Sequence, residues 1–266
     1  MPGNEKEIAK YLVAQKGAVS LQHLGVINSV GAPDLSQRKY TEINTIREAD
    51  NYLSVNDPSK KADIYVNGHG VSLKQSGSSF SFNRLQRANM LEVFSLLGFS
   101  NPAALLQRLD TEVTEFHEGN LERRNRPWQD FFNEDNFKAL VRFLMVQGSP
   151  NVGFSSHQAE FILEAPLHNI SVDNIEVFTF EEYFSKYINN LKIAIRRVWY
   201  GQASDSEHSR AKGLIKKAEN APWVFNNVSG IPDMNDFGER WRQDVSSCER
   251  KTIYFLMIEK EGKNSS

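Results

Sequence analysis

The spacing of apolar residues along the chain predicts several amphipathic helices. In these segments apolar side chains recur at intervals of three or four residues, which is the period of one helix face. The predicted helices span Glu5–Gln15, Ser36–Leu53, Asn83–Leu97, Pro102–Glu118, Asp130–Gln147 and Glu181–Tyr200. By contrast, Leu21–Pro33 consists largely of small residues punctuated by glycine, which predicts a loop.

Shorter runs enriched in β-branched and aromatic residues predict strands. These runs are Ile64–Val66, Val71–Lys74, Ala159–Glu164, Ile175–Phe180 and Thr252–Glu259. Asn67 and Gly68 separate the first two runs, and both residue types tolerate the positive φ that a two-residue hairpin turn requires. The succession of helices, a hairpin, more helices, and then strands with helices predicts an α/β fold with a mixed sheet and helical insertions.

The composition is that of a folded globular protein with balanced charge. Of the 266 residues, 40% are hydrophobic and 24% are charged, and 31 Lys and Arg oppose 33 Asp and Glu for a net charge of −2. We expect one domain over residues 1–266, although this length also suits two small domains. The balanced charge argues against a protein that coats nucleic acid or anionic membrane through bulk charge, but it is compatible with a local basic surface.

The single cysteine, Cys248, excludes an intramolecular disulfide and a cysteine-rich zinc site. A chain of this kind suits a reducing compartment. Residues 1–7 are polar and acidic, unlike a signal peptide, and the longest apolar run, 139–146, is far shorter than a membrane span. We therefore expect a cytoplasmic protein.

The predicted hairpin over residues 61–75 offers the clearest chemistry. Asp63 begins the first strand and Lys74 ends the second, so the two side chains are expected to lie side by side at the open end of the hairpin. A carboxylate there can hold Mg²⁺, which prefers oxygen ligands, and the carbonyl of Leu73 can supply a second oxygen. The ammonium group can orient or deprotonate an attacking water, or stabilise charge that develops on a phosphate. The alternative is a solvated cross-strand ion pair without catalytic function.

This arrangement resembles the catalytic motif of the restriction-endonuclease-like nucleases, Pro-Asp…(Asp/Glu)-X-Lys. The residues that carry the resemblance are Lys61-Ala-Asp63-Ile and Gly70-Val-Ser72-Leu-Lys74-Gln75. It implies a restriction-endonuclease-like core, in which helices flank a mixed sheet. It also implies that Asp63 binds Mg²⁺, that Lys74 is the catalytic lysine and that Ser72 lines the site.

Two positions depart from that motif. Ala62 stands in place of proline, and Ser72 stands in place of the second acid. Some type II restriction enzymes resemble this chain in carrying Ser-X-Lys together with a replacement glutamate from a helix. The candidates for that metal-binding glutamate are Glu92, on the helix after the hairpin, and Glu42 or Glu48, on the helix before it, with Glu42 and Glu92 preferred.

Basic residues with aromatic neighbours recur along the chain and are candidate DNA contacts, because Arg and Lys bind phosphates and also read base edges. We expect DNA contacts from Arg84, Arg87, Arg123, Arg124, Arg126, Arg196 and Arg197. Arg84 and Arg87 follow the hairpin closely and are expected to lie nearest the scissile phosphate. Further recognition elements are expected in residues 100–150 and 190–245. Each basic cluster is also compatible with a solvated helix face.

These features together predict a Mg²⁺-dependent type II restriction endonuclease that cuts double-stranded DNA at a specific sequence. Cutting a symmetric site favours a homodimer, and the resemblance implies a cognate DNA methyltransferase as a functional partner. Two alternatives stay open. One is a repair or recombination nuclease that reads DNA structure, and the other is a non-catalytic DNA-binding protein in which Asp63 and Lys74 form only a structural pair. Ser72, in place of the motif acid, most favours the second alternative.

Overall fold

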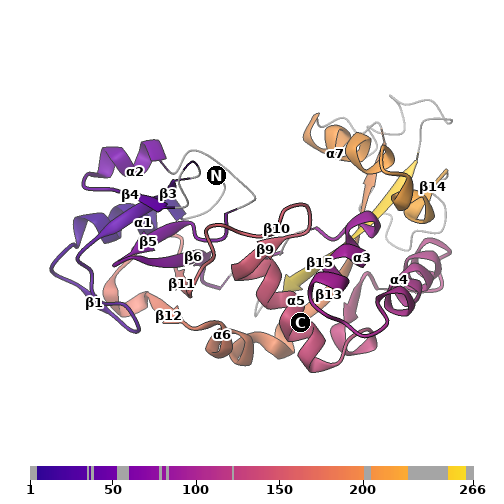
Figure 1. The fold of residues 1–266 in the computed structure, drawn as a ribbon, viewed down its shortest axis with the longest axis horizontal. Coiled ribbons are helices and arrows are strands. Elements are labelled where there is room, and N and C mark those ends of the chain that lie inside the picture. Colours follow the sequence, from indigo (N-terminus) through magenta and orange to yellow (C-terminus); the bar gives the residue numbers. More distant parts are fainter. Residues whose placement is uncertain are drawn as a thin grey trace. The chain divides into compact units, whose positions relative to one another are not determined.

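A computed structural model of the chain describes residues 5–34, 36, 39–52, 60–77, 80, 81, 84–121, 123–200, 205–226 and 251–261. The chain divides into two compact units, each built from separate segments (Figure 1). Unit 1 comprises Met1–Phe80, Lys138–Asn190 and Lys260–Ser266, and unit 2 comprises Ser81–Phe137 and Leu191–Glu259. The backbone passes from one unit to the other several times. The expectation of a single domain stays a prediction. None of the described helices is long and apolar enough to cross a membrane.

Unit 1 is built around a mixed six-stranded sheet with the order β12-β11-β6-β5-β3-β4. Its strands are β3 (Val30–Asp34), β4 (Lys39–Glu42), β5 (Ile64–Val66), β6 (His69–Gln75), β11 (Phe161–Ala165) and β12 (Glu176–Phe178). All neighbouring strands are antiparallel except β6 and β11, which are parallel. A parallel pair needs a long crossover connection, and the one between β6 and β11 includes the unit 2 segment Ser81–Phe137. The predicted α/β class with a mixed sheet is confirmed.

Helices flank this sheet. The apolar side of α1 (Glu5–Ala14) packs against it, and helix and sheet share one core. That core includes Ile8, Ala9, Leu12, Val13, Ile64, Val66, Val71, Leu73 and Leu163. Because successive side chains of a strand point to opposite faces, Ser72, Lys74 and Glu164 point to the other face of the sheet. There, α6 (Phe180–Tyr187) packs against β11 and hydrogen-bonds to Glu164.

The remaining elements of unit 1 are short. They are β1 (Ser20–Leu21), β2 (Gly25–Val26), α2 (Ile46–Tyr52), a π-helix (Phe143–Gln147), β9 (Gly148–Ser149), β10 (Gly153–Phe154) and 3₁₀ turns at Val172–Asn174 and Ile188–Asn190. α2 packs against α1. The helix predicted over Asp130–Gln147 is present as α5 (Glu134–Arg142), which leads directly into the π-helix.

Unit 2 carries a second sheet, with the order β14-β15-β13-β8 and with β7 paired to β15. Its strands are β7 (Phe80–Ser81), β8 (Asn125–Pro127), β13 (Leu191–Trp199), β14 (Val224–Phe225) and β15 (Thr252–Lys260), although the first residue of β7 and the last residue of β15, Lys260, belong to unit 1. Its helices are α3 (Arg87–Leu96), α4 (Pro102–His117), α7 (Asp205–Ile215) and 3₁₀ helices at Trp128–Asp130 and Ala218–Trp223. α7 packs against β13 around the buried residues Val198, Ala211, Leu214, Ile253 and Phe255. The helices predicted over Asn83–Leu97 and Pro102–Glu118 are confirmed as α3 and α4.

The predicted helix over Ser36–Leu53 is wrong in its first half. Residues 39–42 form the edge strand β4, and α2 begins only at Ile46. A capping box explains this start. The Glu48 carboxylate accepts a hydrogen bond from the Thr45 N–H, and the Thr45 hydroxyl accepts one from the Glu48 N–H.

The predicted loop over Leu21–Pro33 is also wrong, because it contains β1, β2 and most of β3. Gly31 lies in the middle of β3, where a Cβ would collide with the ring of Tyr40 on β4. Glycine at this position therefore permits close packing between two strands. Pro33 and Asp34 are the last two residues of β3.

The long helix predicted over Glu181–Tyr200 is in fact a short helix, a 3₁₀ turn and a strand. α6 ends at Tyr187, and β13 begins at Leu191. Ile193 and Ile195 are buried on β13, and such β-branched side chains pack well on a pleated surface. The charged residues of this segment therefore lie on a strand instead of on a helix face.

Candidate active site

The turn of the β5–β6 hairpin has the predicted conformation. Asn67 and Gly68 have φ values of 51° and 85°, as a two-residue primed turn requires. The Asn67 side chain fixes this turn against the preceding segment, because its Oδ1 accepts hydrogen bonds from the N–H groups of Asn28 and Ser29 at 2.8 and 3.1 Å. The strand register that follows pairs Ile64 with Val71, so Asp63 lies opposite Ser72.

Four consecutive hydrogen bonds connect Asp63, Ser72, Leu73 and Lys74 at the open end of this hairpin. Asp63 Oδ2 accepts from the Leu73 N–H at 2.7 Å and from the Ser72 hydroxyl at 3.3 Å. Lys74 Nζ donates to Ser72 Oγ at 2.8 Å and to the Leu73 carbonyl at 3.1 Å. We refer to these residues as the hairpin group. The structure therefore brings together the predicted carboxylate, carbonyl and ammonium groups.

The charge of Lys74 is not neutralised inside the described part of unit 1. Both acceptors of its ammonium group are neutral, and among the described residues no carboxylate oxygen lies within 4.0 Å of its Nζ. The side chains of Asp63 and Lys74 are half-buried, whereas Ser72 is 1% exposed. A partly desolvated cation of this kind interacts strongly with an incoming anion, because the local dielectric is lower than that of water.

Glu5, the first residue of α1, is a second carboxylate whose pKa responds to the charges of this site, and sequence reasoning missed it. Burial raises the pKa of Glu5, and the negative charge of Asp63 raises it further, while Lys74 acts in the opposite direction. α1 packs against β6, which accounts for this proximity. No local pattern distinguishes Glu5 from Glu7 two residues later, so the sequence contains no signal for it.

Lys61 is a further residue of this site that was missed as a functional candidate. It is 8% exposed, and its Nζ donates to the Leu144 carbonyl at 2.8 Å. Burial and, to a smaller extent, the charge of Lys74 lower the pKa of Lys61 to about 8, while the charge of Asp63 acts in the opposite direction. Two lysines therefore contribute positive potential around the carboxylate of Asp63.

His157 supports the strand that carries Asp63. Its carbonyl accepts hydrogen bonds from the N–H groups of Lys61 and Ala62, both at 2.9 Å. Its ring is fully buried, with Nε2 3.1 Å from the Asp34 carbonyl and Nδ1 2.9 Å from the Tyr65 hydroxyl. Since a carbonyl only accepts, Nε2 carries the proton and Nδ1 accepts from Tyr65 in the neutral ring. These contacts identify His157 as a structural residue.

The glutamates predicted as metal ligands do not join the hairpin group. Glu42 is exposed on the edge strand β4, and β3 separates it from β5. Two strand spacings amount to about 9.6 Å. Glu48 is engaged in the capping box of α2, and Glu92 is exposed on α3 of unit 2. Among the described residues, no group of three or more His, Cys, Asp or Glu side chains is arranged to hold a metal ion.

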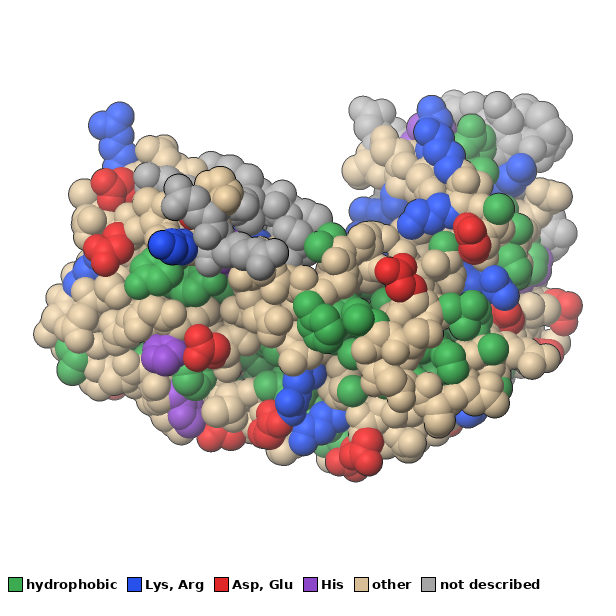
Figure 2. Space-filling model, in the orientation of Figure 1, with side chains coloured by type: hydrophobic (Ala, Val, Ile, Leu, Met, Phe, Trp, Pro, Cys, Tyr) green, Lys and Arg blue, Asp and Glu red, His purple; other side chains and the backbone are tan. Residues whose placement is uncertain are grey.

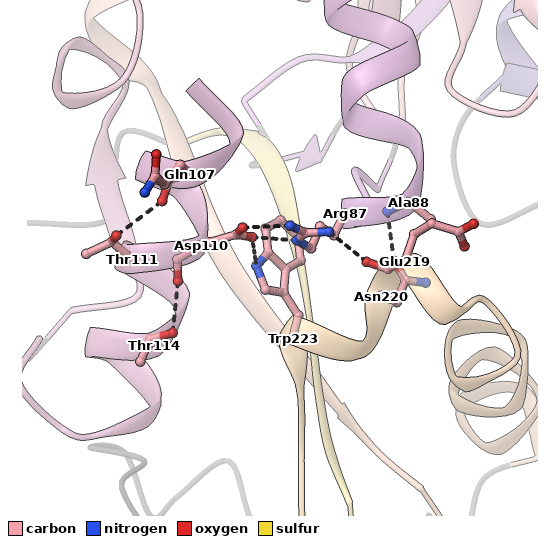
Figure 3. A network of polar contacts seen from close by, with 9 residues as sticks. All are labelled: Arg87, Ala88, Gln107, Asp110, Thr111, Thr114, Glu219, Asn220 and Trp223. Atoms are coloured by element: carbon pink, nitrogen blue, oxygen red, sulfur yellow. Dashed lines mark hydrogen bonds and ion pairs between the residues drawn. The ribbon is translucent and has the colours of Figure 1, made fainter. Parts of the chain in front are cut away.

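Arg87, predicted to reach DNA, belongs to a closed polar network in unit 2 (Figure 3). Its Nε and Nη2 donate to the two carboxylate oxygens of Asp110 at 2.7 and 2.8 Å, and its Nη1 donates to the Glu219 carbonyl at 3.0 Å. Trp223 Nε1 donates to the same carboxylate at 2.8 Å. We refer to these contacts as the Arg87 network. They engage the guanidinium group within the protein, so Arg87 acts as a structural link.

Two further arginines of the predicted DNA surface are paired with acids. Arg126 lies 3.2 Å from a carboxylate oxygen of Glu112 and 3.1 Å from one of Asp130. Arg196 forms an ion pair with Glu259. Their charges are therefore largely balanced within unit 2.

The other predicted arginines differ in exposure. The guanidinium carbon of Arg84 lies 5.6 Å from the centroid of the Phe255 ring, in a cation–π contact. Arg123 and Arg124 are exposed before β8, and Arg197 is half-buried on β13. Exposure makes Arg84, Arg123 and Arg124 the members of the predicted set that are most accessible to a ligand.

A basic surface that was noticed in the sequence lies on α7. Figure 2 shows Lys and Arg side chains gathered over this helix on the visible face of unit 2. The basic residues of α7 and of the positions directly after it are Arg210, Lys212, Lys216 and Lys217. The cluster at Arg240 and Arg242, and also Cys248, lie outside the described residues.

Comparison with known proteins reveals no relative: no family model, no curated protein and no solved structure matches this chain. A functional conclusion therefore depends on the hairpin group and its surroundings in unit 1.

Proposed function

We propose that this chain is a Mg²⁺-dependent endonuclease that hydrolyses phosphodiester bonds of double-stranded DNA at a specific sequence. The observation that carries the proposal is the hairpin group, in which Asp63 accepts from the Leu73 N–H and from the Ser72 hydroxyl, while the Lys74 ammonium donates to the Leu73 carbonyl and to Ser72 Oγ. These are the groups that the resemblance to restriction-endonuclease-like nucleases requires. The mixed sheet with flanking helices supports a core of that kind.

Asp63, Glu5 and the Leu73 carbonyl are the proposed Mg²⁺ ligands. All three offer oxygen atoms, and Mg²⁺ keeps several waters, so a site with so few protein ligands suits this ion. The effect of Asp63 on the pKa of Glu5 indicates that the two acids repel one another. A divalent cation would relieve that repulsion. When bound, Mg²⁺ would stabilise charge on the phosphate and activate a water molecule. Glu5 thus takes the role that was predicted for Glu42 or Glu92.

Lys74 is the proposed catalytic lysine. An ammonium group has three N–H donors, and the contacts with Ser72 and Leu73 use two of them. The third has no partner among the described residues and is proposed to bind a phosphate oxygen or the attacking water, and the positive charge would stabilise the negative charge that develops on the phosphate. Ser72 does not replace the missing acid of the motif in this arrangement. Its hydroxyl instead connects Asp63 to Lys74 and fixes the ammonium group.

Cleavage of a sequenced plasmid with Mg²⁺ tests this function, with EDTA as the metal-free control. The parent protein is expected to produce discrete fragments, whereas Lys74→Ala is expected to abolish cleavage and to leave DNA binding largely intact. Lys39→Ala is the matched control, because Lys39 is exposed on the edge strand β4. Full cleavage by Lys74→Ala would refute the assignment of the site.

The same experiment separates the alternatives. A smear, or cleavage confined to branched DNA, would indicate a nuclease that reads DNA structure. DNA binding without Mg²⁺-dependent cleavage would indicate a non-catalytic protein, the reading that Ser72 favours. Sedimentation of the protein with DNA measures whether it acts as a homodimer, as cutting of both strands of a symmetric site suggests.

A further inference from the structure

A second polar cluster of unit 1 has no part in the proposed reaction. Glu164 on β11 and Lys260 form an ion pair, with 2.7 Å between Glu164 Oε1 and Lys260 Nζ. Two tyrosines of α6 complete the cluster: Tyr183 donates to Glu164 Oε1 at 3.0 Å, and Tyr187 donates to Oε2 at 2.5 Å. Glu164 and Lys260 are only 1% and 3% exposed. Burying an ion pair costs solvation free energy, so stability alone is a weak reason for its presence.

Glu164 is the cross-strand neighbour of the candidate catalytic lysine. The parallel register of β6 and β11 places it beside Lys74, and neighbouring strands lie about 4.8 Å apart. Paired residues share a face of the sheet, so both side chains point to the same side. In agreement with this, burial lowers the pKa of Lys260, and the positive charge of Lys74 contributes to that lowering.

Lys74 nevertheless does not pair with Glu164. Its ammonium group donates to Ser72 and Leu73, and the two carboxylate oxygens of Glu164 accept from Lys260 and from the tyrosines of α6. An ammonium group is attracted more strongly to a carboxylate than to a neutral hydroxyl or carbonyl, because the interaction between opposite charges is strong where the local dielectric is low. Without its present cation, Glu164 would therefore be the preferred partner of Lys74.

We infer that Lys260 is a positioning residue that holds Glu164 away from Lys74 and so keeps the Lys74 ammonium available to the substrate phosphate. This inference rests on the proposed nuclease function and concerns the same site. The Tyr187 ring supports the position of Lys260, whose Nζ lies 3.9 Å from the ring centroid in a cation–π contact.

Substitution of Lys260 and Glu164, singly and together, tests this inference. In Lys260→Met, Glu164 loses its cation and recruits Lys74, so plasmid cleavage with Mg²⁺ is expected to fall about 100-fold, as when one transition-state donor is removed. In Glu164→Gln the acid is absent and Lys74 keeps its place. Folded Glu164→Gln and the double variant are therefore expected to cleave within about tenfold of the parent rate, because the donor itself is retained.

If Glu164 and Lys260 form only a structural ion pair, a different pattern of cleavage rates is expected. Each single substitution leaves one buried charge unpaired, so both would impair folding, and the rate per folded molecule would be the same in both. Equal rates for folded Lys260→Met and Glu164→Gln overturn the inference. A double variant that is no faster than Lys260→Met does so too.

A crystal structure of Lys260→Met provides a readout that does not depend on cleavage. The expected result is that Lys74 Nζ lies about 2.7–2.9 Å from a carboxylate oxygen of Glu164; an ammonium that stays on Ser72 and Leu73 overturns the inference. A parent protein that cleaves no DNA with Mg²⁺ would refute the proposed function, yet this distance would still test the pairing. If Lys260→Met does not fold, the double variant of Lys260→Met and Glu164→Gln decides. Cleavage at near the parent rate by this variant supports the inference, and loss of cleavage overturns it.

Discussion

The hairpin group of unit 1 and the Arg87 network of unit 2 are both built from an aspartate, a basic side chain and neighbouring neutral groups, but they use their charges differently. In the Arg87 network, both carboxylate oxygens of Asp110 accept hydrogen bonds from Arg87 (Figure 3). In the hairpin group, the acceptors of Lys74 among the described residues are a hydroxyl and a carbonyl. Asp63, in turn, repels a second acid, Glu5.

This difference separates charges that are paired within the protein from charges that can still attract a ligand. A bidentate arginine–carboxylate pair satisfies both partners, so it fixes two helices and retains little attraction for a ligand. An ammonium on neutral acceptors, beside two acids that repel one another, keeps the capacity to bind an anion and a cation. The sequence shows an acid and a base in both places, and only the pairing in space distinguishes them.

Asp63→Asn is expected to produce the largest effect. The amide oxygen of asparagine can still accept hydrogen bonds from Leu73 and Ser72, so the fold should be retained. The lost charge removes the proposed Mg²⁺ ligand, and cleavage is expected to fall about 1,000-fold or more. Rates of plasmid cleavage, with thermal unfolding as the folding control, measure both effects. If Asp63→Asn cleaves at the parent rate, Asp63 is not the proposed Mg²⁺ ligand.

Glu5→Gln is expected to have the next largest effect. It removes the second carboxylate, so the Mg²⁺ concentration needed for half-maximal cleavage should rise about 10- to 100-fold. Glu7→Gln on the same helix is the matched control, since Glu7 is exposed and pairs with Lys10. A Mg²⁺ titration of cleavage compares the two variants, and equal midpoints would exclude Glu5 from the metal site.

Asp110→Asn tests whether the Arg87 network stabilises the fold of unit 2. It leaves the Arg87 guanidinium without its carboxylate, which costs about 2 kcal/mol, or about 30-fold in the unfolding equilibrium. Chemical denaturation measures this loss, while cleavage by the folded protein should be unchanged. Asp130→Asn is the control, because its exposed ion pair with Arg126 is worth at most about 1 kcal/mol. A loss of cleavage without a loss of stability in Asp110→Asn would contradict a structural role.

The hairpin group could be predicted because the signals for it are local. The primed turn at Asn67 and Gly68 sets the register, and the register alone brings Asp63 beside Ser72 and Lys74. The strand β3 could not be predicted in this way, since Gly31 serves a contact with the Tyr40 ring of another strand. A prediction from residue propensities assigns a segment with such a glycine to a loop.

The second carboxylate and the charge balance of the site depend on tertiary packing. Glu5 joins the site because α1 packs against β6, and Glu164 lies beside Lys74 only through the parallel pairing of two distant strands. The pairing of Arg87 with Asp110 also depends on tertiary packing, because Asp110 lies on another helix. By contrast, Thr45 and Glu48 have the spacing of a capping box, a local signal that the predicted helix over Ser36–Leu53 did not use and that marks the start of α2.

The smallest expected effect concerns His117, which lies on α4 together with Asp110. Its ring stacks on Phe225 with a centroid distance of 3.8 Å, and burial lowers its pKa, while Glu118 acts in the opposite direction.

At His117, the unfolded chain therefore binds a proton at a higher pH than the folded chain. The stability contribution of neutral His117 is present above pH 6.5 and is lost as the pH falls through the lower folded pKa. The free energy of unfolding should thus decrease less between pH 7.5 and about 5 in His117→Gln than in the parent. Identical pH profiles would show that the stacked ring titrates as it does in the unfolded chain.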